Sequence, residues 1–393
     1  MELVPKDFKK EINLRIGRIR EKLKDEGSDA ILIGSNANIY YSTGRFFRGY
    51  VYIPLKNDPL WFVIKPRLFE SEENIFNIRK PEDIPAILKG QEYSLPDTIA
   101  LEESDLSYSD IMRLKALFPL AELKNGSSVM KKARMVKTAW ELAEMKEDGR
   151  HHVKVYGEIK DCYQPGMSDL RLQIEIEKRL RLEGSLGVSR VSGNLMEINL
   201  GSVISGDNAD NPAPYEFTMG GAGVNSALPV GANNSPILKG QTVMIDMNGA
   251  FNGYQTDVTR VWSLGNIPPL AQSAHNCSIR ILRELEKKAV PGIPVSKLYE
   301  IACEIVSKEN LDKYFMGHKS QVSFIGHGVG IELNELPVIN AKSKDILEEN
   351  MTLAIEPKFV IPEVGAVGVE NTYVVTSNGL LNITPFPEEI QNF

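Results

Sequence analysis

Two β-prone runs flank an Asn-Gly pair in the second half of the chain, and this stretch constrains the fold more than any other. It runs from Val243 to Trp262 and reads V-M-I-D-M-N-G-A-F-N-G-Y-Q-T-D-V-T-R-V-W. Asn-Gly between apolar runs is a strong signal for a tight two-residue turn, so Asn252-Gly253 predicts an antiparallel hairpin. With the turn there, Phe251 pairs with Tyr254, and this fixes the register of both strands.

The predicted register brings two carboxylates to one face of the hairpin. Asp246 faces Thr259, and Asn248 faces Asp257. Because side chains along a strand alternate between faces, Asp246 and Asp257 become diagonal neighbours roughly 7–8 Å apart. Two carboxylates held in this way repel each other unless a cation lies between them. The hairpin therefore predicts part of a cation site.

Composition narrows the classes of protein and of partner. A length of 393 residues suggests two or three domains with ample core. The net charge of −7, with no basic block to offset it, argues against nucleic acid or an anionic membrane as partner. Three scattered cysteines, with no CxxC spacing and no apolar signal or membrane segment, predict buried thiols and a cytoplasmic protein.

The first third of the chain predicts a smaller α/β domain. An amphipathic helix is expected over 7–27 and a further helix over 108–117. Between them, apolar runs predict strands over 30–34, 50–55, 60–65 and 98–101. A polar patch at 124–128 suggests the boundary, so the predicted domains are 1–128 and 129–393.

The remainder predicts an α+β domain built around the hairpin. Helices are expected over 137–161, 168–183, 270–289 and 295–309, and three strand-like runs follow His327. The segment 196–236 is rich in Gly, Asn and Pro and is expected to be a long loop. A loop of this length inside a compact domain is usually functional or mobile.

Three more residues could join the two aspartates around a cation. His327 stands among glycines in G-H-G-V-G, and Glu356 and Glu370 stand in the apolar runs A-I-E-P and V-G-V-E-N. Charged side chains in such runs are rarely buried without a partner. Taken singly, each could be a solvated turn, strand or loop residue. Four carboxylates and one imidazole together suit two divalent cations with mixed oxygen and nitrogen ligation, such as Mn, Co, Zn or Fe.

The order of these motifs resembles the creatinase/prolidase/aminopeptidase P/methionine aminopeptidase family, whose catalytic domain has the pita-bread fold. The first ~130 residues resemble the N-terminal domain of the prolidase and creatinase branch. The resemblance implies a pita-bread domain, five metal ligands at Asp246, Asp257, His327, Glu356 and Glu370, two divalent ions with Mn favoured, and a homodimer. It also implies that Asp257 and Glu370 bridge the two ions and that Glu356 acts as general base.

The sequence departs from the family pattern where peptidases carry further histidines. Val230 stands at one of these positions and Asn334 at the other, and neither can act as acid or base. About fifteen residues lie between Asn208 and Asn225, inside a motif of the active site, which suggests a reshaped substrate pocket. We therefore expect substrate contacts from Val230, Asn334, Tyr215 and Phe217, with Asn334 also part of the catalytic set. Arg260 could hold a carboxylate and contact substrate, or form a structural ion pair.

Three functions remain open at this point. The first is a dinuclear metal-dependent hydrolase resembling Xaa-Pro dipeptidase, which cleaves an amide bond in a small peptide-like substrate. The second keeps the metal but acts on a non-peptide bond, as a creatinase-like C–N hydrolase or a lyase, because the histidines are replaced. The third is a binding protein without catalysis, although a scaffold would not need four buried carboxylates.

Overall fold

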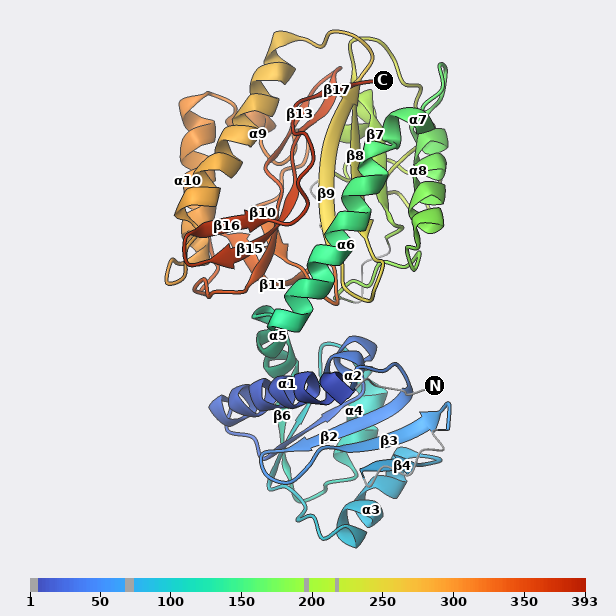
Figure 1. Cartoon of the computed structure of the whole chain (residues 1–393), viewed down its shortest axis with the longest axis vertical. Coiled ribbons are helices and arrows are strands. Elements are labelled where there is room, and N and C mark those ends of the chain that lie inside the picture. The colour runs from blue at the N-terminus through green and yellow to red at the C-terminus, as the bar shows by residue number, and fades with distance from the viewer. Residues whose placement is uncertain (1–5, 68–73, 194–197, 216–218) are drawn as a thin grey trace. The chain divides into compact units, whose positions relative to one another are not determined.

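The computed structural model describes residues 6–67, 74–193, 198–215 and 219–393. The chain divides into two compact units, Met1–Arg134 and Met135–Phe393 (Figure 1). The boundary lies a few residues beyond the predicted one, because helix α5 (Ser127–Met135) continues past the polar patch at 124–128.

The N-terminal unit is a six-stranded mixed sheet with helices around it. The sheet order is β4-β3-β2-β1-β5-β6, in which β1 runs antiparallel to β2 and parallel to β5. The expected helices and strands are present, with ends that differ by a few residues at most. The elements are α1 (Lys6–Asp25), β1 (Ala30–Ile33), α2 (Asn36–Thr43), β2 (Arg48–Pro54), β3 (Leu60–Lys65), β4 (Ile75–Asn77), η1 (Pro81–Asp83), α3 (Ile84–Gly90), β5 (Thr98–Leu101), α4 (Tyr108–Lys115) and β6 (Glu122–Asn125).

The C-terminal unit places strands between two pairs of helices, so the predicted α+β class is confirmed (Figure 1). Helices α6 (Ala139–Gly157) and α8 (Asp169–Glu183) pack on the sheet β17-β9-β8-β7. Helices α9 (Pro269–Lys288) and α10 (Val295–Lys308) pack against the remaining strands through a second apolar core. The strands are β7 (Gly201–Ser205), β8 (Thr242–Gly249), β9 (Thr256–Ser263), β10 (Phe324–Gly328), β11 (Glu335–Asn340), β12 (Thr352–Ile355), β13 (Lys358–Ile361), β14 (Gly365–Gly368), β15 (Asn371–Thr376), β16 (Gly379–Asn382) and β17 (Gln391–Asn392), and short helices are α7 (Ile159–Cys162), η2 (Gly206–Asp210) and η3 (Asp312–Tyr314).

Local signals explain where the long helices start and stop. Thr138 caps α6, because its Oγ1 accepts a hydrogen bond from the Glu141 amide nitrogen. In turn, the Glu141 carboxylate accepts a hydrogen bond from the Thr138 amide nitrogen. Ser168 caps α8, and Gly184 ends it with φ +114°, a conformation that glycine adopts without strain. These caps fix the helices that cover the hairpin.

The register predicted for the hairpin is confirmed, but the tight turn is wrong. Strands β8 and β9 pair Asp246 with Thr259 and Asn248 with Asp257. The ladder ends at Gly249 and Thr256, and the residues between them form a wider loop. Helix α6 holds this loop, because the amide nitrogen of Phe251 donates to Asp148 Oδ1 at 2.6 Å and Asn252 Nδ2 donates to the Glu144 carbonyl at 2.8 Å.

The prediction of a continuous loop over 196–236 is also wrong in part. Strand β7 lies within it and pairs with β8, from Gly201 opposite Met247 to Ser205 opposite Val243. Val203 and Ile204 stabilise this strand pairing, because their apolar side chains are buried on opposite faces of β7. Strand β7 is therefore an edge strand of the sheet that contains the hairpin.

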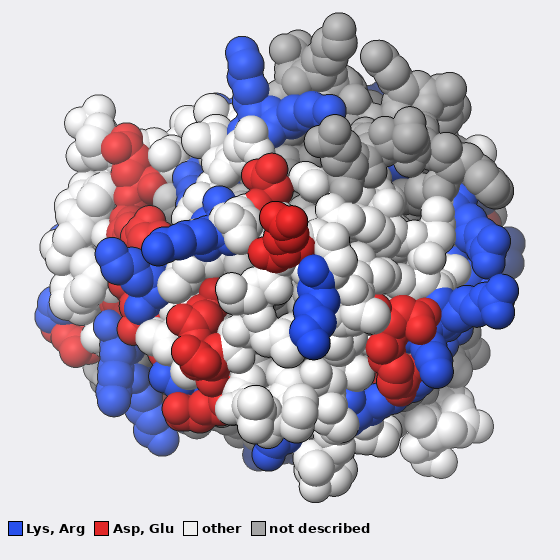
Figure 2. Space-filling model, turned by 90° about the horizontal axis from the view of Figure 1, so that it is seen from below, with Lys and Arg blue, Asp and Glu red and all other residues white. Residues whose placement is uncertain are grey.

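The charged side chains on one face of the molecule carry both signs. On the face of the described residues shown in Figure 2, acidic and basic side chains are interspersed and form no patch of one sign. None of the helices that the structure describes combines the length and the hydropathy needed to cross a bilayer.

Candidate metal centre

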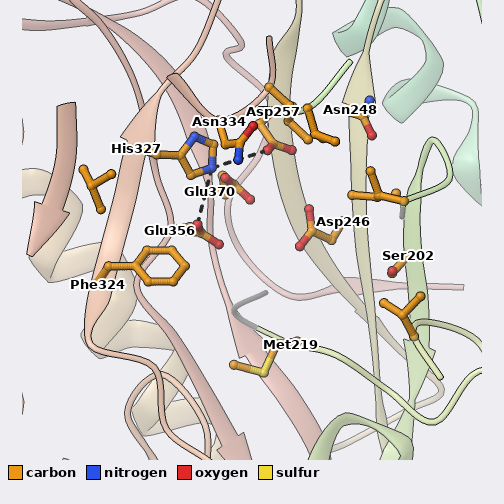
Figure 3. Close-up of a pocket in the computed structure, with 16 residues that line it drawn as sticks. Ser202, Met219, Asp246, Asn248, Asp257, Phe324, His327, Asn334, Glu356 and Glu370 are labelled. Carbon is orange, nitrogen blue, oxygen red and sulfur yellow. Dashed lines mark ion pairs between the residues drawn. The ribbon is translucent and has the colours of Figure 1, made fainter. Parts of the chain in front are cut away.

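Five strands carry or adjoin the five predicted ligands and bring them to one place. Asp246 lies on β8, Asp257 on β9 and His327 on β10, while Glu356 directly follows β12 and Glu370 directly precedes β15. Glu370 is fixed to the hairpin, because its amide nitrogen donates to the Thr259 carbonyl at 3.2 Å. All five side chains line one cavity of about 180 Å³ (Figure 3).

The cavity has an acidic end and an apolar wall. Figure 3 shows His327 pointing toward Asp257 and Glu356, with Asp246 and Glu370 close by. The apolar wall is made by Val191, Ile198, Met219, Val230, Phe324, Leu333 and Val338. A polar end beside an apolar wall is the usual construction of a site that holds a small ligand in one orientation.

His327 presents one ring nitrogen to the carboxylates. Its Nδ1 lies 3.0 Å from the Gly328 carbonyl, and a carbonyl only accepts, so we assign the proton to Nδ1. Nε2 then carries a lone pair and lies 3.9 Å from Asp257 Oδ2 and 3.7 Å from Glu356 Oε1. These separations are too long for hydrogen bonds, but two ligands each about 2.1 Å from one ion are separated by distances of this order.

Glu370 is the most deeply buried ligand and is incompletely paired. Its Oε2 accepts from Thr259 Oγ1 at 2.7 Å and from Lys358 Nζ at 2.9 Å. Its Oε1 is buried and accepts no hydrogen bond from the described residues. Burial raises the pKa of Glu370 to about 8; Lys358 lowers it, and the Glu356 and Asp246 carboxylates raise it. A buried acceptor without a partner is costly, and here it marks a place for a cation.

The electrostatics at Asp257 point the same way. Burial and the neighbouring Glu370 and Asp246 carboxylates raise the pKa of Asp257 well above its ordinary value. A group of like charges in a buried site is stable only when protons or cations neutralise it. The arrangement therefore favours a bound cation over a set of free carboxylates.

A lysine that the sequence analysis overlooked lies among these carboxylates. Lys358 is fully buried, and its Nζ donates to Asp246 Oδ2 at 2.8 Å, to Glu356 Oε2 at 2.8 Å and to Glu370 Oε2 at 2.9 Å. Burial alone would lower the pKa of Lys358, but the three carboxylates outweigh it and raise that pKa well above its ordinary value. The ammonium is therefore charged at neutral pH.

The sequence did carry a signal for Lys358. It stands two residues after Glu356 in A-I-E-P-K-F-V-I, a run whose other members are apolar except for that glutamate. A lysine in a buried strand needs an anionic partner, and side chains two residues apart share a face of a strand.

The two halves of the ligand set differ in their fit to a divalent ion. The group Asp257, His327 and Glu370 offers one ligand atom from each residue, and these atoms all lie within 4.8 Å of one another. This group fits an ion with mixed oxygen and nitrogen ligation. The group Asp246, Glu356 and Glu370 is equally compact, but all three members accept from Lys358.

Val230 and Asn334, which stand where the resemblance leads us to expect histidines, both line the cavity. Val230 contributes to the apolar wall. The Asn334 amide is already paired at both ends with one residue, since Oδ1 accepts from the Ser192 amide nitrogen at 2.6 Å and Nδ2 donates to the Ser192 carbonyl at 2.9 Å. Asn334 therefore holds the segment around Ser192 beside the cavity, and we do not assign it a catalytic role.

Two other predicted substrate residues, Arg260 and Tyr215, do not line the cavity. Arg260 is fully buried, and its guanidinium donates to the carbonyls of Thr259 and Glu370 and to others, so it holds the backbone of a ligand instead of contacting substrate. Tyr215 lines a separate, smaller cavity beside Asp210 and His318. Phe217 lies outside the described residues. Among the described residues of the inserted stretch, Met219 lines the cavity of the predicted ligands.

The other histidines have partners elsewhere. His318 Nδ1 lies 3.1 Å from Asp210 Oδ2. On helix α6, His151 contacts Glu183 and His152 contacts Thr256. None of these three lines the main cavity, so His327 supplies the imidazole among the residues that do.

Comparisons with known proteins agree with the fold. The description "Metallopeptidase family M24" matches residues 143–377, and "Creatinase/Prolidase N-terminal domain" matches residues 15–136. The chain is 28% identical over 376 residues to an Xaa-Pro dipeptidase of Pyrococcus furiosus, covering 94% of this chain and 97% of that protein.

Solved structures show the same two-domain fold. An Xaa-Pro dipeptidase from Bacillus anthracis superposes with a TM-score of 0.79 at 22% identity, covering 97% of this chain and 100% of the other. The prolidase from Pyrococcus horikoshii gives a TM-score of 0.77 at 22% identity over 96% and 99% of the two chains. With the family match extending over more than half of its length, this chain belongs to metallopeptidase family M24.

Proposed function

We propose that this protein is a metal-dependent hydrolase of the Xaa-Pro dipeptidase type that cleaves an amide bond in a small peptide-like substrate. The observation that carries the proposal is the buried Glu370 Oε1, which has no hydrogen-bond partner among the described residues, in a residue grouped with Asp257 and His327. Relatives of similar length bear the name Xaa-Pro dipeptidase. They favour a peptidase over the creatinase-like enzyme and the binding protein predicted as alternatives.

The protein's own groups divide the work at the cavity. A bound divalent ion supplies an acidified water and polarises a carbonyl. Asp257, His327 and Glu370 would hold this ion, and Glu356 is placed to accept a proton from water in the cavity. Lys358 fixes the orientation of the Glu356 carboxylate through its 2.8 Å hydrogen bond.

The dimensions of the cavity limit the substrate. About 180 Å³ and an apolar wall suit a short peptide with a compact apolar side chain or ring. Val230, Phe324 and Leu333 would contact that part of the substrate.

A panel of dipeptides tests the proposal. Protein loaded with Mn²⁺, Co²⁺, Zn²⁺ or Fe²⁺ is expected to hydrolyse at least one Xaa-Pro dipeptide, and activity should disappear with a chelator and return with the ion. Manganese is the first ion to test. Ion binding without hydrolysis of any Xaa-Pro or other dipeptide would contradict the proposal.

Val230 offers a test of the peptide-handling half of the site. Val230→His places an imidazole on the cavity wall and should raise turnover of an Xaa-Pro dipeptide by about 10-fold, because the imidazole can assist proton transfer. Val230→Leu is the matched control and should give no gain. A folded, ion-loaded Val230→His protein without gain would indicate that this enzyme does not use a group at that position.

The homodimer and the cytoplasmic location that the sequence predicts remain predictions. Light scattering coupled to gel filtration measures the first, and fractionation of the source cells measures the second.

A further inference from the structure

The Lys358 ammonium lies at the point where three predicted ligands converge. Its Nζ is 2.8–2.9 Å from one oxygen each of Asp246, Glu356 and Glu370. The side chain is 0% exposed and is not part of the cavity wall, so it reaches the carboxylates from the protein interior. A fixed positive charge is therefore part of the acidic cluster before any ion binds.

A divalent ion held by the same three residues would compete with this ammonium. Carboxylate ligands lie about 2.0–2.2 Å from such an ion, so the ion would need the space in which these three oxygens surround Nζ. Two positive charges in contact inside a buried site repel strongly, since little water screens them. The Lys358 side chain also cannot turn out to solvent without disturbing its neighbours, because it is fully buried at the start of β13.

The other half of the cluster lacks such a competitor. None of the described residues donates a hydrogen bond to Glu370 Oε1. His327 and Asp257 do not contact Lys358 at hydrogen-bonding distance, whereas the other three ligands do. One ion position is thus open and the second is filled by the protein itself.

We propose that Lys358 is a built-in cation that replaces one of two divalent ions, so that the site binds a single ion at Asp257, His327 and Glu370. The single-ion part rests on the proposed function, because it assumes that an ion binds at all. The role of Lys358 is that of a positioning residue: it holds Asp246, Glu356 and Glu370 in place.

Ion counting on the full-length protein tests this. After loading with Mn²⁺ and removal of free ion, wild-type protein should contain about one equivalent, and Lys358→Ala, which vacates the position, about two. Lys137→Ala is the matched control: Lys137 is also buried and pairs with Glu335 at 2.9 Å outside the cluster, so its removal should leave the count at about one. Anomalous diffraction from Mn-soaked crystals should place the wild-type ion beside His327.

Each outcome decides between the two proposals. Two ions in wild-type protein would overturn the proposed role of Lys358 and leave the proposed function standing. This result needs the wild-type protein alone, so it can be obtained even when Lys358→Ala does not fold. An unchanged single ion in folded Lys358→Ala would also overturn it. No ion in wild-type protein but one in the variant would support Lys358 as internal cation and contradict the proposed function. No ion in either would contradict both.

Discussion

Each of the two units buries a glutamate, and the two glutamates are treated in opposite ways. In the N-terminal unit, fully buried Glu102 accepts from the amide nitrogens of Gly34 and Ser35 at 2.6 and 2.8 Å, from Ser35 Oγ at 2.7 Å and from Asn38 Nδ2 at 2.5 Å. In the C-terminal unit, Glu370 has one buried oxygen to which none of the described residues donates, and it shares its cavity with three more carboxylates.

The difference separates a structural carboxylate from a ligand. Neutral donors satisfy Glu102 completely, so it ties the β1–α2 connection to β5 and needs nothing further. Glu370 is left with an acceptor that only a cation or a proton can satisfy. Burial raises the pKa of both carboxyls, so burial does not distinguish them; the hydrogen-bond partners do.

The largest expected effect comes from neutralising the ligand. Glu370→Gln removes a negative charge and places an amide where Lys358 and Thr259 donate. We expect loss of the bound ion and a fall in kcat/KM of about 100-fold or more, because removal of a direct ligand should cost at least as much as removal of a supporting group. Ion content and dipeptide hydrolysis measure the two effects. Retention of ion and activity would remove the distinction between the two glutamates.

The matched substitution in the other unit should act on stability alone. Glu102→Gln turns an acceptor into a donor that faces the donors of Gly34, Ser35 or Asn38. We expect the free energy of unfolding to fall by about 2 kcal/mol, the cost of an unsatisfied buried polar group. A denaturant titration of the full chain measures it. Ion content should be unchanged, and a lost ion in the folded variant would contradict a purely structural role.

A pH series on metal-free protein sharpens the comparison. The pKa of Glu370 is raised to about 8 in the folded state, so the folded protein keeps a proton that the unfolded chain releases above its ordinary pKa. The stability from this proton is complete at low pH and is lost as pH rises through about 8. The midpoint of thermal unfolding should therefore fall between pH 5 and pH 8 in metal-free protein.

Two controls isolate Glu370 in that series. A bound divalent ion replaces the proton, so the fall should shrink on loading with Mn²⁺. The Glu370→Gln variant should also show a smaller fall. Glu102 contributes equally with and without ion, because it lies in the other unit and all its acceptors are filled. Identical pH profiles with and without ion would show that Glu370 does not exchange a proton for it.

The sequence predicted which five side chains meet at the cavity, because the information was local or carried by motifs. The position of Asn252-Gly253 midway between the two apolar runs was enough to place Asp246 opposite Thr259 and Asp257 opposite Asn248. The wide loop after Gly249 was not predictable from its own residues, since Asp148 and Glu144, more than a hundred residues earlier, hold it through hydrogen bonds. Tertiary contacts here outweigh the turn preference of Asn-Gly.

Hydrogen-bond partners that lie far along the chain were not predictable for the same reason. Asn334 was expected to act on substrate, but its amide faces Ser192, which its sequence neighbours do not reveal. Lys358 was overlooked because the cluster it neutralises assembles only when Asp246 and Glu370 meet in the fold. Residue type and spacing predicted which side chains gather at the cavity, whereas the three partners of Lys358 became visible only in the fold.

The smallest expected effect applies the same criterion to a side chain on the cavity wall. Both ends of the Asn334 amide are paired, so Asn334 resembles Glu102 more than Glu370. Asn334→Ala should release the segment around Ser192, raising KM by about 3-fold while leaving kcat within about 2-fold, because the group makes no contact that strengthens in the transition state. Steady-state kinetics on an Xaa-Pro dipeptide separate the two constants. A collapse of kcat with KM unchanged would return Asn334 to the catalytic set. It would mean that a side-chain amide whose oxygen and nitrogen are both hydrogen-bonded to Ser192 can exchange that partner for substrate.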